Sequence, residues 1–231
     1  MLFKALTDIL CRLPEGPRRH VSRAGAAVIW RLYAKVKVEG REHLPDGPCL
    51  FIANHLSNAD GITLSRALAP RTVHFLAGVK LGQTPLTRLG LEAVRTIAIK
   101  PGTADLEAIR RALAVLREGD SVLLFPEGTR SRTGALQPAR RGAALIASKA
   151  GVPVVPVAIS GTEKLLPIND RDMGGEMIQR AEVTVRIGRP LDVKQLQQDL
   201  PADAEPRQAL VDALMREVAA LLPPGYRGVY G

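Results

Sequence analysis

The most constraining feature of this chain is a set of short, almost wholly apolar runs that alternate with helical patterns. The runs at 49–53 and 121–125 are each followed by a polar segment or a proline. Runs of this length between turn signals are typical of strands buried in a parallel sheet. Because strands alternate with helices along the chain, the sequence predicts an α/β layered fold, with a mostly parallel central sheet flanked by helices.

Helices are predicted where apolar residues recur every three or four positions, and strands where apolar residues run together or alternate. The predicted helices span 2–11, 18–34, 60–68, 84–89, 103–118, 140–150 and 206–222. The predicted strands span 35–39, 49–53, 73–77, 95–99, 121–125, 154–160 and 181–187. A chain of 231 residues is long enough for one well-buried core. We therefore expect N-terminal helices (1–34), one main domain (35–222) and a loosely ordered tail (223–231).

A polar segment, Asn-His-Leu-Ser-Asn-Ala-Asp at 54–60, follows the first buried run. Open α/β sheets usually bind ligands beyond the carboxyl ends of their strands, so His55 is well placed for a site. A chain reversal between His55 and Asp60 would let the carboxylate hold one ring nitrogen while the other accepts a proton from an alcohol. The alternative is that His55 ends the strand and Asp60 caps the next helix.

A second polar segment, Phe-Pro-Glu-Gly-Thr-Arg-Ser at 125–131, follows the other buried run. Gly128 permits a tight turn and Thr129 offers a hydroxyl. Arg130 carries a forked, permanently charged set of donors that matches phosphate geometry. Glu127 is suited to hold an arginine or another nearby base in place. The alternative is an ordinary basic loop exposed to solvent.

Together the two segments resemble the motifs of the glycerolipid acyltransferase family, typified by lysophosphatidic acid acyltransferase (1-acyl-sn-glycerol-3-phosphate O-acyltransferase). That family carries an Asn-His-x4-Asp motif and a Phe-Pro-Glu-Gly-Thr-Arg-Ser motif in this order and at about this separation. Arg141-Gly142 and the Val-Pro-Val-Val-Pro-Val segment at 152–157 resemble two weaker family features. The resemblance covers about residues 36–165, and two matched motifs in the right order make it specific.

The resemblance implies an enzyme that transfers an acyl chain from acyl-CoA or acyl-carrier protein to the free hydroxyl of lysophosphatidic acid, giving phosphatidic acid in phospholipid biosynthesis. His55 would be the general base and Asp60 would orient it, with no covalent acyl-enzyme. The acceptor phosphate would be bound by Arg130 with Glu127, Gly128, Thr129 and Lys100. Lys100 departs from the family pattern, which often has Arg there. The alternatives are another lysophospholipid or alcohol acceptor, or a non-catalytic basic membrane-binding protein.

Positive charge is concentrated at the N-terminus. Residues 1–37 hold eight basic and two acidic side chains, which accounts for six of the nine net positive charges. Two helical apolar patterns, at 2–11 and 18–34, lie in the same stretch. We therefore expect a pair of basic amphipathic helices that dock on an anionic membrane surface. The alternative is that both helices pack on the core. No apolar stretch reaches the roughly 18 residues that a spanning helix needs.

Composition and spacing argue against other partners. The chain has only four Phe, three Tyr and one Trp, so it is poorly suited to stacking nucleic-acid bases. Its two Cys and four His do not cluster at metal-ligand spacings, and no motif calls for an organic cofactor. With so few cysteines and no recognisable signal peptide, the protein is expected to be cytoplasmic and peripheral on the inner face of the cell membrane.

Overall fold

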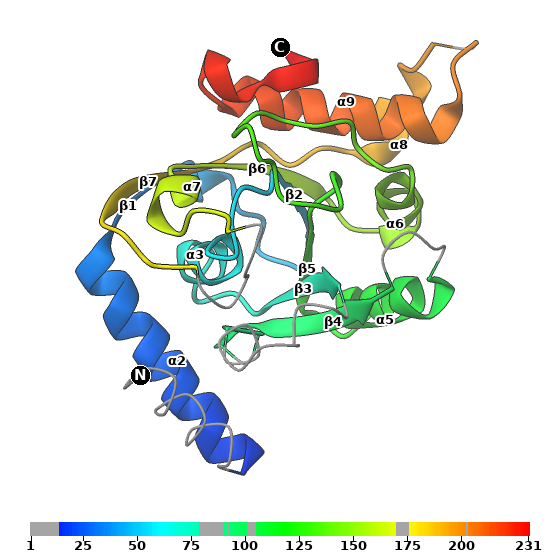
Figure 1. Cartoon of the computed structure of the whole chain (residues 1–231). Helices are drawn as coiled ribbons and strands as arrows, with labels where there is room; N and C mark the ends of the chain where they lie inside the picture. Colours follow the sequence, from blue (N-terminus) through cyan, green and yellow to red (C-terminus); the bar gives the residue numbers. More distant parts are fainter. Residues whose placement is uncertain (1–13, 79–89, 92, 101–104, 170–175, 202) are drawn as a thin grey trace.

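A seven-stranded sheet forms the centre of the molecule (Figure 1). The computed structural model describes residues 14–78, 90–91, 93–100, 105–169, 176–201 and 203–231. The strands are β1 (Ala34–Glu39), β2 (Leu50–Ala53), β3 (Val73–Gly78), β4 (Arg95–Ile99), β5 (Ser121–Leu124), β6 (Val154–Ser160) and β7 (Ala181–Ile187). Their order is β1-β7-β6-β2-β5-β3-β4, and every neighbouring pair is parallel except β6 with β7. The predicted mostly parallel sheet is therefore confirmed.

Helices cover both faces of this sheet. They are α2 (Glu15–Tyr33), α3 (Asp60–Ala67), α5 (Leu106–Arg117), α6 (Gly142–Ala150), α7 (Thr162–Leu165), α8 (Val193–Gln198) and α9 (Pro206–Leu221). Short 3-10 helices are η1 (Arg41–His43), η4 (Pro224–Tyr226) and η5 (Gly228–Tyr230). The buried side chains of α5, α6, α8 and α9 share one apolar cluster, and those of α3 and α7 share the other.

Strand β2 shows why the apolar runs are continuous. Leu50 and Ile52 point into the cluster under α5, α6 and α9, whereas Phe51 and Ala53 point into the cluster under α3. All four side chains are fully buried. A strand covered on both faces has no polar positions, which is the pattern of a central parallel strand.

The connections diverge at the middle of the sheet. The chain leaves β2 toward α3 on one face, whereas it leaves the adjacent strand β5 toward α6 on the other face. Neighbouring strands whose connections part in this way leave a crevice beyond their carboxyl ends, where open α/β sheets bind ligands. Both polar motifs begin at this point.

Two predicted helices lie outside the described residues, and two observed helices were not predicted. The predicted helices at 2–11 and 84–89 lie outside the described residues, so the expected N-terminal helix pair is represented by α2 alone. The short helices α7 and α8 were not expected from the sequence. In the part of the chain that the structure describes, no helix has the length and apolar character needed to cross a bilayer.

The C-terminal tail at 223–231 is packed, which corrects the expected loose ending. The Tyr226 hydroxyl donates to a carboxylate oxygen of Glu163 at 2.7 Å. The Tyr230 hydroxyl donates to Asp212 at 2.8 Å and accepts from the backbone N–H of Ala139 at 2.9 Å. The two tyrosines thus tie the tail to the body by partners that lie far away in sequence.

Candidate functional site

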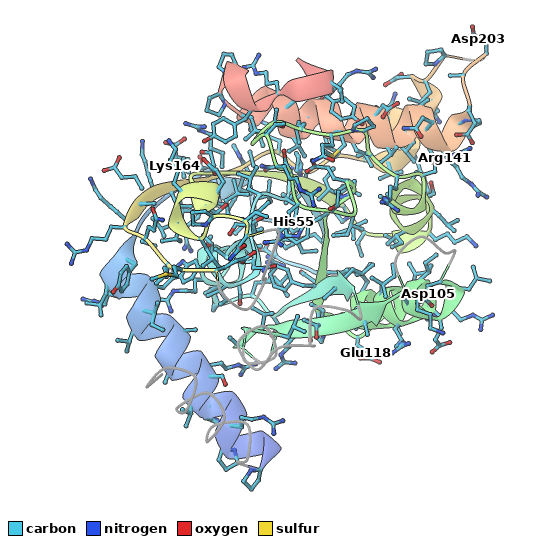
Figure 2. The ribbon with its side chains drawn as sticks, viewed as in Figure 1. His55, Asp105, Glu118, Arg141, Lys164 and Asp203 are labelled. Atoms are coloured by element: carbon cyan, nitrogen blue, oxygen red, sulfur yellow. The ribbon has the colours of Figure 1, made fainter. Side chains whose placement is uncertain are left out.

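The first polar motif starts where β2 leaves the sheet. The Asn54 side chain donates to the carbonyl of Ile159 and accepts from the N–H of the same residue, both at 2.8 Å. Its amide therefore continues the pairing of β2 with β6 for one more step beyond Ala53. The next residue, His55, lies beyond the end of β2, and Figure 2 labels it near the centre of the view.

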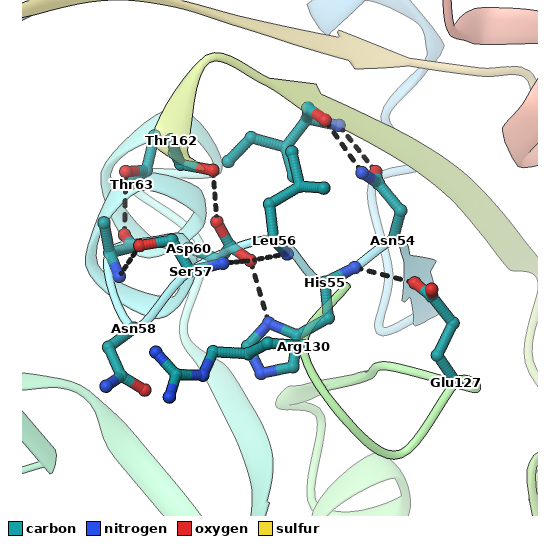
Figure 3. A network of polar contacts seen from close by, with 12 residues as sticks. Asn54, His55, Leu56, Ser57, Asn58, Asp60, Thr63, Glu127, Arg130 and Thr162 are labelled. Carbon is teal, nitrogen blue, oxygen red and sulfur yellow. Dashed lines mark hydrogen bonds and ion pairs between the residues drawn. The ribbon is translucent and has the colours of Figure 1, made fainter. Parts of the chain in front are cut away.

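His55 and Asp60 form a hydrogen-bonded pair (Figure 3). The His55 Nδ1 atom lies 2.8 Å from Asp60 Oδ2. An ionised carboxylate only accepts, so Nδ1 carries the hydrogen and the lone pair is on Nε2. Within the described part of the chain Nε2 has no hydrogen-bond partner, and the side chain is 17% exposed. The imidazole is therefore oriented on one side and open to an incoming proton on the other.

The Asp60 carboxylate is fully buried and held by four donors. Besides the imidazole, Oδ2 accepts the N–H groups of Leu56 at 2.7 Å and Ser57 at 3.0 Å. Oδ1 accepts the Thr162 hydroxyl at 2.5 Å. These bonds offset the cost of removing a charge from water. Although Asp60 is the first residue of α3, its carboxylate serves the loop before the helix, so the alternative of a simple helix cap does not hold.

The ring of Phe125 fixes the plane of the imidazole. The two ring centroids are 4.1 Å apart and the planes are inclined by 13°, which is a stacked arrangement. Phe125 follows β5 and His55 follows β2, so the stacking is a direct result of the pairing of these two strands. Together with Asp60, the stacked ring leaves His55 little freedom to rotate.

Glu127 joins the two motifs through backbone contacts. One carboxylate oxygen accepts the N–H of His55 and the other accepts the N–H of Gln137, both at 2.9 Å. Burial raises the pKa of Glu127 to about 7, and the two backbone hydrogen bonds oppose that rise. The Ser131 N–H also donates to the His55 carbonyl at 2.7 Å. The backbone of His55 is thus anchored to the second motif at both its N–H and its carbonyl.

The second motif begins with a tight turn. The N–H of Gly128 donates to the carbonyl of Phe125 at 3.0 Å, with Pro126 at the second position of the turn. Gly128 has a φ of 68°, and a Cβ there would lie 2.7 Å from the Nε atom of Arg140. Glycine is therefore needed for both its conformation and its lack of a side chain.

Arg130 points toward the first motif and is paired with a carboxylate. Its Nη1 atom donates to Glu176 Oε1 at 2.6 Å. The other oxygen of Glu176 accepts from Nδ2 of Asn58 at 2.8 Å. The side chains of Arg130 and Glu176 are 15% and 1% exposed. A guanidinium, an amide and an open imidazole nitrogen thus gather beyond the ends of β2 and β5.

A model of the acyltransferase family matches residues 35–160, more than half of the chain. The chain belongs to the acyltransferase family. The matched region contains both polar motifs, the His55–Asp60 pair and Arg130. The resemblance seen in the sequence is therefore confirmed.

Several relatives of this acyltransferase are known. It is 30% identical to the 1-acyl-sn-glycerol-3-phosphate acyltransferase of Bacillus subtilis, over 71% of this chain and 77% of the relative. It is 39% identical to the lyso-ornithine lipid O-acyltransferase of Pseudomonas aeruginosa, over 54% of this chain and 47% of the relative. The chain spans about half the length of the plant chloroplast 1-acyl-sn-glycerol-3-phosphate acyltransferases that it also matches.

A solved structure shares the whole architecture. The crystal structure of the 1-acyl-sn-glycerophosphate acyltransferase PlsC from Thermotoga maritima matches 95% of this chain and 88% of its own, with a TM-score of 0.63 and 26% identity. The fold of this acyltransferase is therefore the fold of that enzyme over nearly its full length.

The structure places the residues expected at the phosphate site in different environments. Arg130 lies beside the His55 loop, and Thr129 is exposed directly after the turn that ends at Gly128. The Glu127 carboxylate, in contrast, is only 2% exposed and accepts two backbone N–H groups, so it supports the loops and does not face a ligand. Lys100 follows β4 at the same end of the sheet, but β3 separates β4 from β5.

Four contributors to the site were not assigned a role from the sequence: Asn54, Phe125, Thr162 and Glu176. Thr162 and the partner of Asn54 lie more than 100 residues from the first motif. The sequence contains one usable signal, because a polar residue directly after a buried strand usually needs a partner in the neighbouring strand. It does not say which strand that neighbour is.

Proposed function

We propose that this acyltransferase transfers an acyl chain from a thioester donor, acyl-CoA or acyl-carrier protein, to the free hydroxyl of lysophosphatidic acid. The observation that carries the proposal is the open Nε2 atom of a His55 oriented by Asp60, with the Arg130 guanidinium joined through Glu176 to Asn58 of the same loop. The names of the bacterial relative and of the structural neighbour support the same acceptor.

The reaction follows from this arrangement. His55 Nε2 removes the proton of the acceptor hydroxyl as its oxygen attacks the thioester carbonyl. The new C–O bond forms, the C–S bond breaks, and the departing thiolate takes the proton from the imidazolium. Asp60 stabilises the imidazolium while it exists, because a buried carboxylate lies 2.8 Å from Nδ1. No side chain is acylated.

Arg130 gives the proposal its sharpest test. In Arg130→Ala the KM for lysophosphatidic acid should rise about tenfold or more, because a charge-assisted contact with the phosphate is lost. The KM for a monoacylglycerol, which has no phosphate, should stay unchanged. Initial rates of thiol release with each acceptor measure both values.

The matched control is Arg216→Ala, which removes an exposed arginine from α9, on the sheet face opposite to α3. Equal KM values for lysophosphatidic acid in wild type and Arg130→Ala would remove Arg130 from the acceptor site. A wild-type enzyme that releases no thiol with any acceptor would reject the acyltransferase activity itself.

A second candidate acceptor is a lyso-ornithine lipid. The Arg130–Glu176 pair places a cationic and an anionic group side by side, and ornithine carries both a carboxylate and an ammonium group. The name of the 39% identical relative from Pseudomonas aeruginosa agrees with such an acceptor. Comparing kcat/KM for lyso-ornithine lipid and lysophosphatidic acid decides between the two.

We also propose that α2 docks the enzyme on an anionic membrane surface. Apolar side chains lie exposed along one stripe of this helix, namely Val21, Val28, Ile29, Leu32 and Tyr33. Trp30, on another side, is buried in the core cluster of α3 and fastens the helix to the domain. Figure 1 shows α2 projecting away from the body of the molecule. An exposed apolar stripe with basic neighbours is typical of an interfacial helix.

The double variant Val28→Ser, Leu32→Ser should bind vesicles containing phosphatidylglycerol about tenfold or more less tightly than wild type. Each of these side chains is about 60% exposed in the structure, and burying one in a bilayer is worth about 1.5–3 kcal/mol. Vesicle co-sedimentation measures the loss. The control Leu106→Ser removes a similarly exposed leucine from α5 and should bind normally. Unweakened binding of the double variant would place the docking surface elsewhere.

A further inference from the structure

One buried carboxylate near the site has no part in the proposed chemistry. Glu176 precedes β7, and its side chain is 1% exposed. Both of its oxygens are engaged: Oε1 accepts from Arg130 at 2.6 Å, and Oε2 accepts from Asn58 at 2.8 Å. A carboxylate buried to this degree with two side-chain donors is built into the structure and is not a chance surface contact.

The donors around Glu176 come from both motifs. Asn58 belongs to the loop after β2, which also carries His55, and Arg130 belongs to the loop after β5. A guanidinium and an amide N–H that together hold two carboxylate oxygens can hold two phosphate oxygens in the same way. Glu176 therefore uses the donors that an acceptor phosphate needs.

The backbone is anchored shortly after Glu176. The N–H of Gln179 donates to the carbonyl of Leu165 at 2.8 Å, and Ile178 packs against the core cluster of α3. Met177, between Glu176 and this anchor, is 77% exposed. Glu176 therefore lies three residues from a fixed backbone contact, so a carboxylate displaced from Arg130 moves by rotation of its own side chain.

We propose that Glu176 occupies the phosphate position of the acceptor site and is displaced when an anionic headgroup binds. This inference rests on the proposed function, because it concerns the same acceptor. A phosphate and a carboxylate at one guanidinium repel each other at low exposure to solvent, so the two compete for Arg130. The apparent dissociation constant for lysophosphatidic acid is therefore the intrinsic constant divided by the fraction of molecules in which Glu176 has left Arg130. An acceptor without a charged headgroup forms no ionic contact with Arg130 and does not displace Glu176.

The substitution Glu176→Gln tests this competition. The glutamine has the same shape but a neutral oxygen, which holds Arg130 less strongly. We expect the KM for lysophosphatidic acid to fall about fivefold with kcat within about twofold of wild type, and the KM for a monoacylglycerol to stay unchanged. Glu176→Asp keeps the charge but shortens the side chain by one methylene, so its KM for lysophosphatidic acid should also fall.

A double-mutant cycle separates competition from general loosening. In an Arg130→Ala background, Glu176→Gln should lower the KM for lysophosphatidic acid by much less than in the wild-type background, since only the Asn58 amide is left for the two anions to share. The control Glu182→Gln removes an exposed carboxylate of β7 that binds Lys35 and should alter neither KM. Thermal unfolding of each variant checks that the domain remains folded.

A binding measurement on a variant that cannot turn over tests the displacement of Glu176 independently of the reaction. Titration of a soluble short-chain lysophosphatidic acid into His55→Ala, with and without Glu176→Gln, should show about fivefold tighter binding when the carboxylate is absent. Tighter binding together with an inactive wild type would support the displaced carboxylate and reject the proposed function. A KM or dissociation constant that is unchanged or raised in Glu176→Gln would overturn the inference. A raised KM for lyso-ornithine lipid would instead assign Glu176 to an acceptor ammonium group.

Discussion

Replacing His55 with alanine should lower kcat for acyl transfer by about 10²- to 10⁴-fold, the usual contribution of a general base. The imidazole is held at Nδ1 by Asp60 and against one face by Phe125. Its Nε2 atom is therefore already oriented before the acceptor binds. The alanine variant should fold normally, since the His55 side chain makes no backbone contact that the loop needs. Free-thiol release in detergent micelles, with lysophosphatidic acid and an acyl thioester, measures the rate.

The chain supplies a matched control for this substitution. His74 on β3 also bonds an aspartate, with its Nε2 atom 3.0 Å from Asp120, and its side chain is 19% exposed against 17% for His55. That second pair lies at the opposite ends of the strands, because His74 is near the start of β3 and Asp120 precedes β5. His74→Ala should therefore retain wild-type kcat. A His55→Ala enzyme with a tenth or more of the wild-type rate would exclude His55 as the base.

The strands and the two motifs were predictable because their signals are local. A run such as 49–53 can be buried on both faces only at the centre of a sheet, and the polar residues after it must then lie at the sheet's edge. Pro126 and Gly128 mark the turn after β5 by their own conformational limits. Local sequence patterns were sufficient to predict these features, and the described strands agree with the prediction.

The contacts that complete the site depend on which strands become neighbours. Asn54 meets Ile159 and Asp60 meets Thr162 because β6 lies beside β2. Periodicity identifies a strand but not its partner, so these bonds could not be predicted. The helix α7, which carries Thr162, has only four residues, too few for a helical pattern to emerge.

Charge patterns were the least reliable signals. Glu127 stands between Pro and Gly beside an arginine, which suggested an ion pair, yet its carboxylate turns inward to two backbone N–H groups. Arg130 is paired instead with Glu176, a residue 46 positions away for which the sequence suggested no role. A sequence shows which charges exist, whereas the fold decides which of them are removed from water.

Replacing Asp60 with asparagine should lower kcat by about 10³-fold while leaving the domain folded. An amide oxygen can still accept the N–H groups of Leu56 and Ser57, and the Thr162 hydroxyl can rotate to accept from the amide nitrogen. What is lost is the negative charge beside Nδ1, and with it the stabilisation of the imidazolium that forms as the acceptor is deprotonated. The KM for the acceptor should change little, because Asp60 is fully buried and does not contact it.

Two measurements separate this role from a purely structural one. The proton on Nδ1 of His55 should give a low-field NMR signal in the wild type that moves or disappears in Asp60→Asn, whereas the thermal midpoint should fall by only a few degrees. Asp120→Asn, which alters the His74 pair, should change neither the rate nor that signal. Wild-type turnover in Asp60→Asn would show that the imidazolium needs no carboxylate and would reduce the pair to a fold-stabilising contact. A loss of turnover with an unfolded domain would assign Asp60 to the loop before α3, since four hydrogen bonds converge on it there.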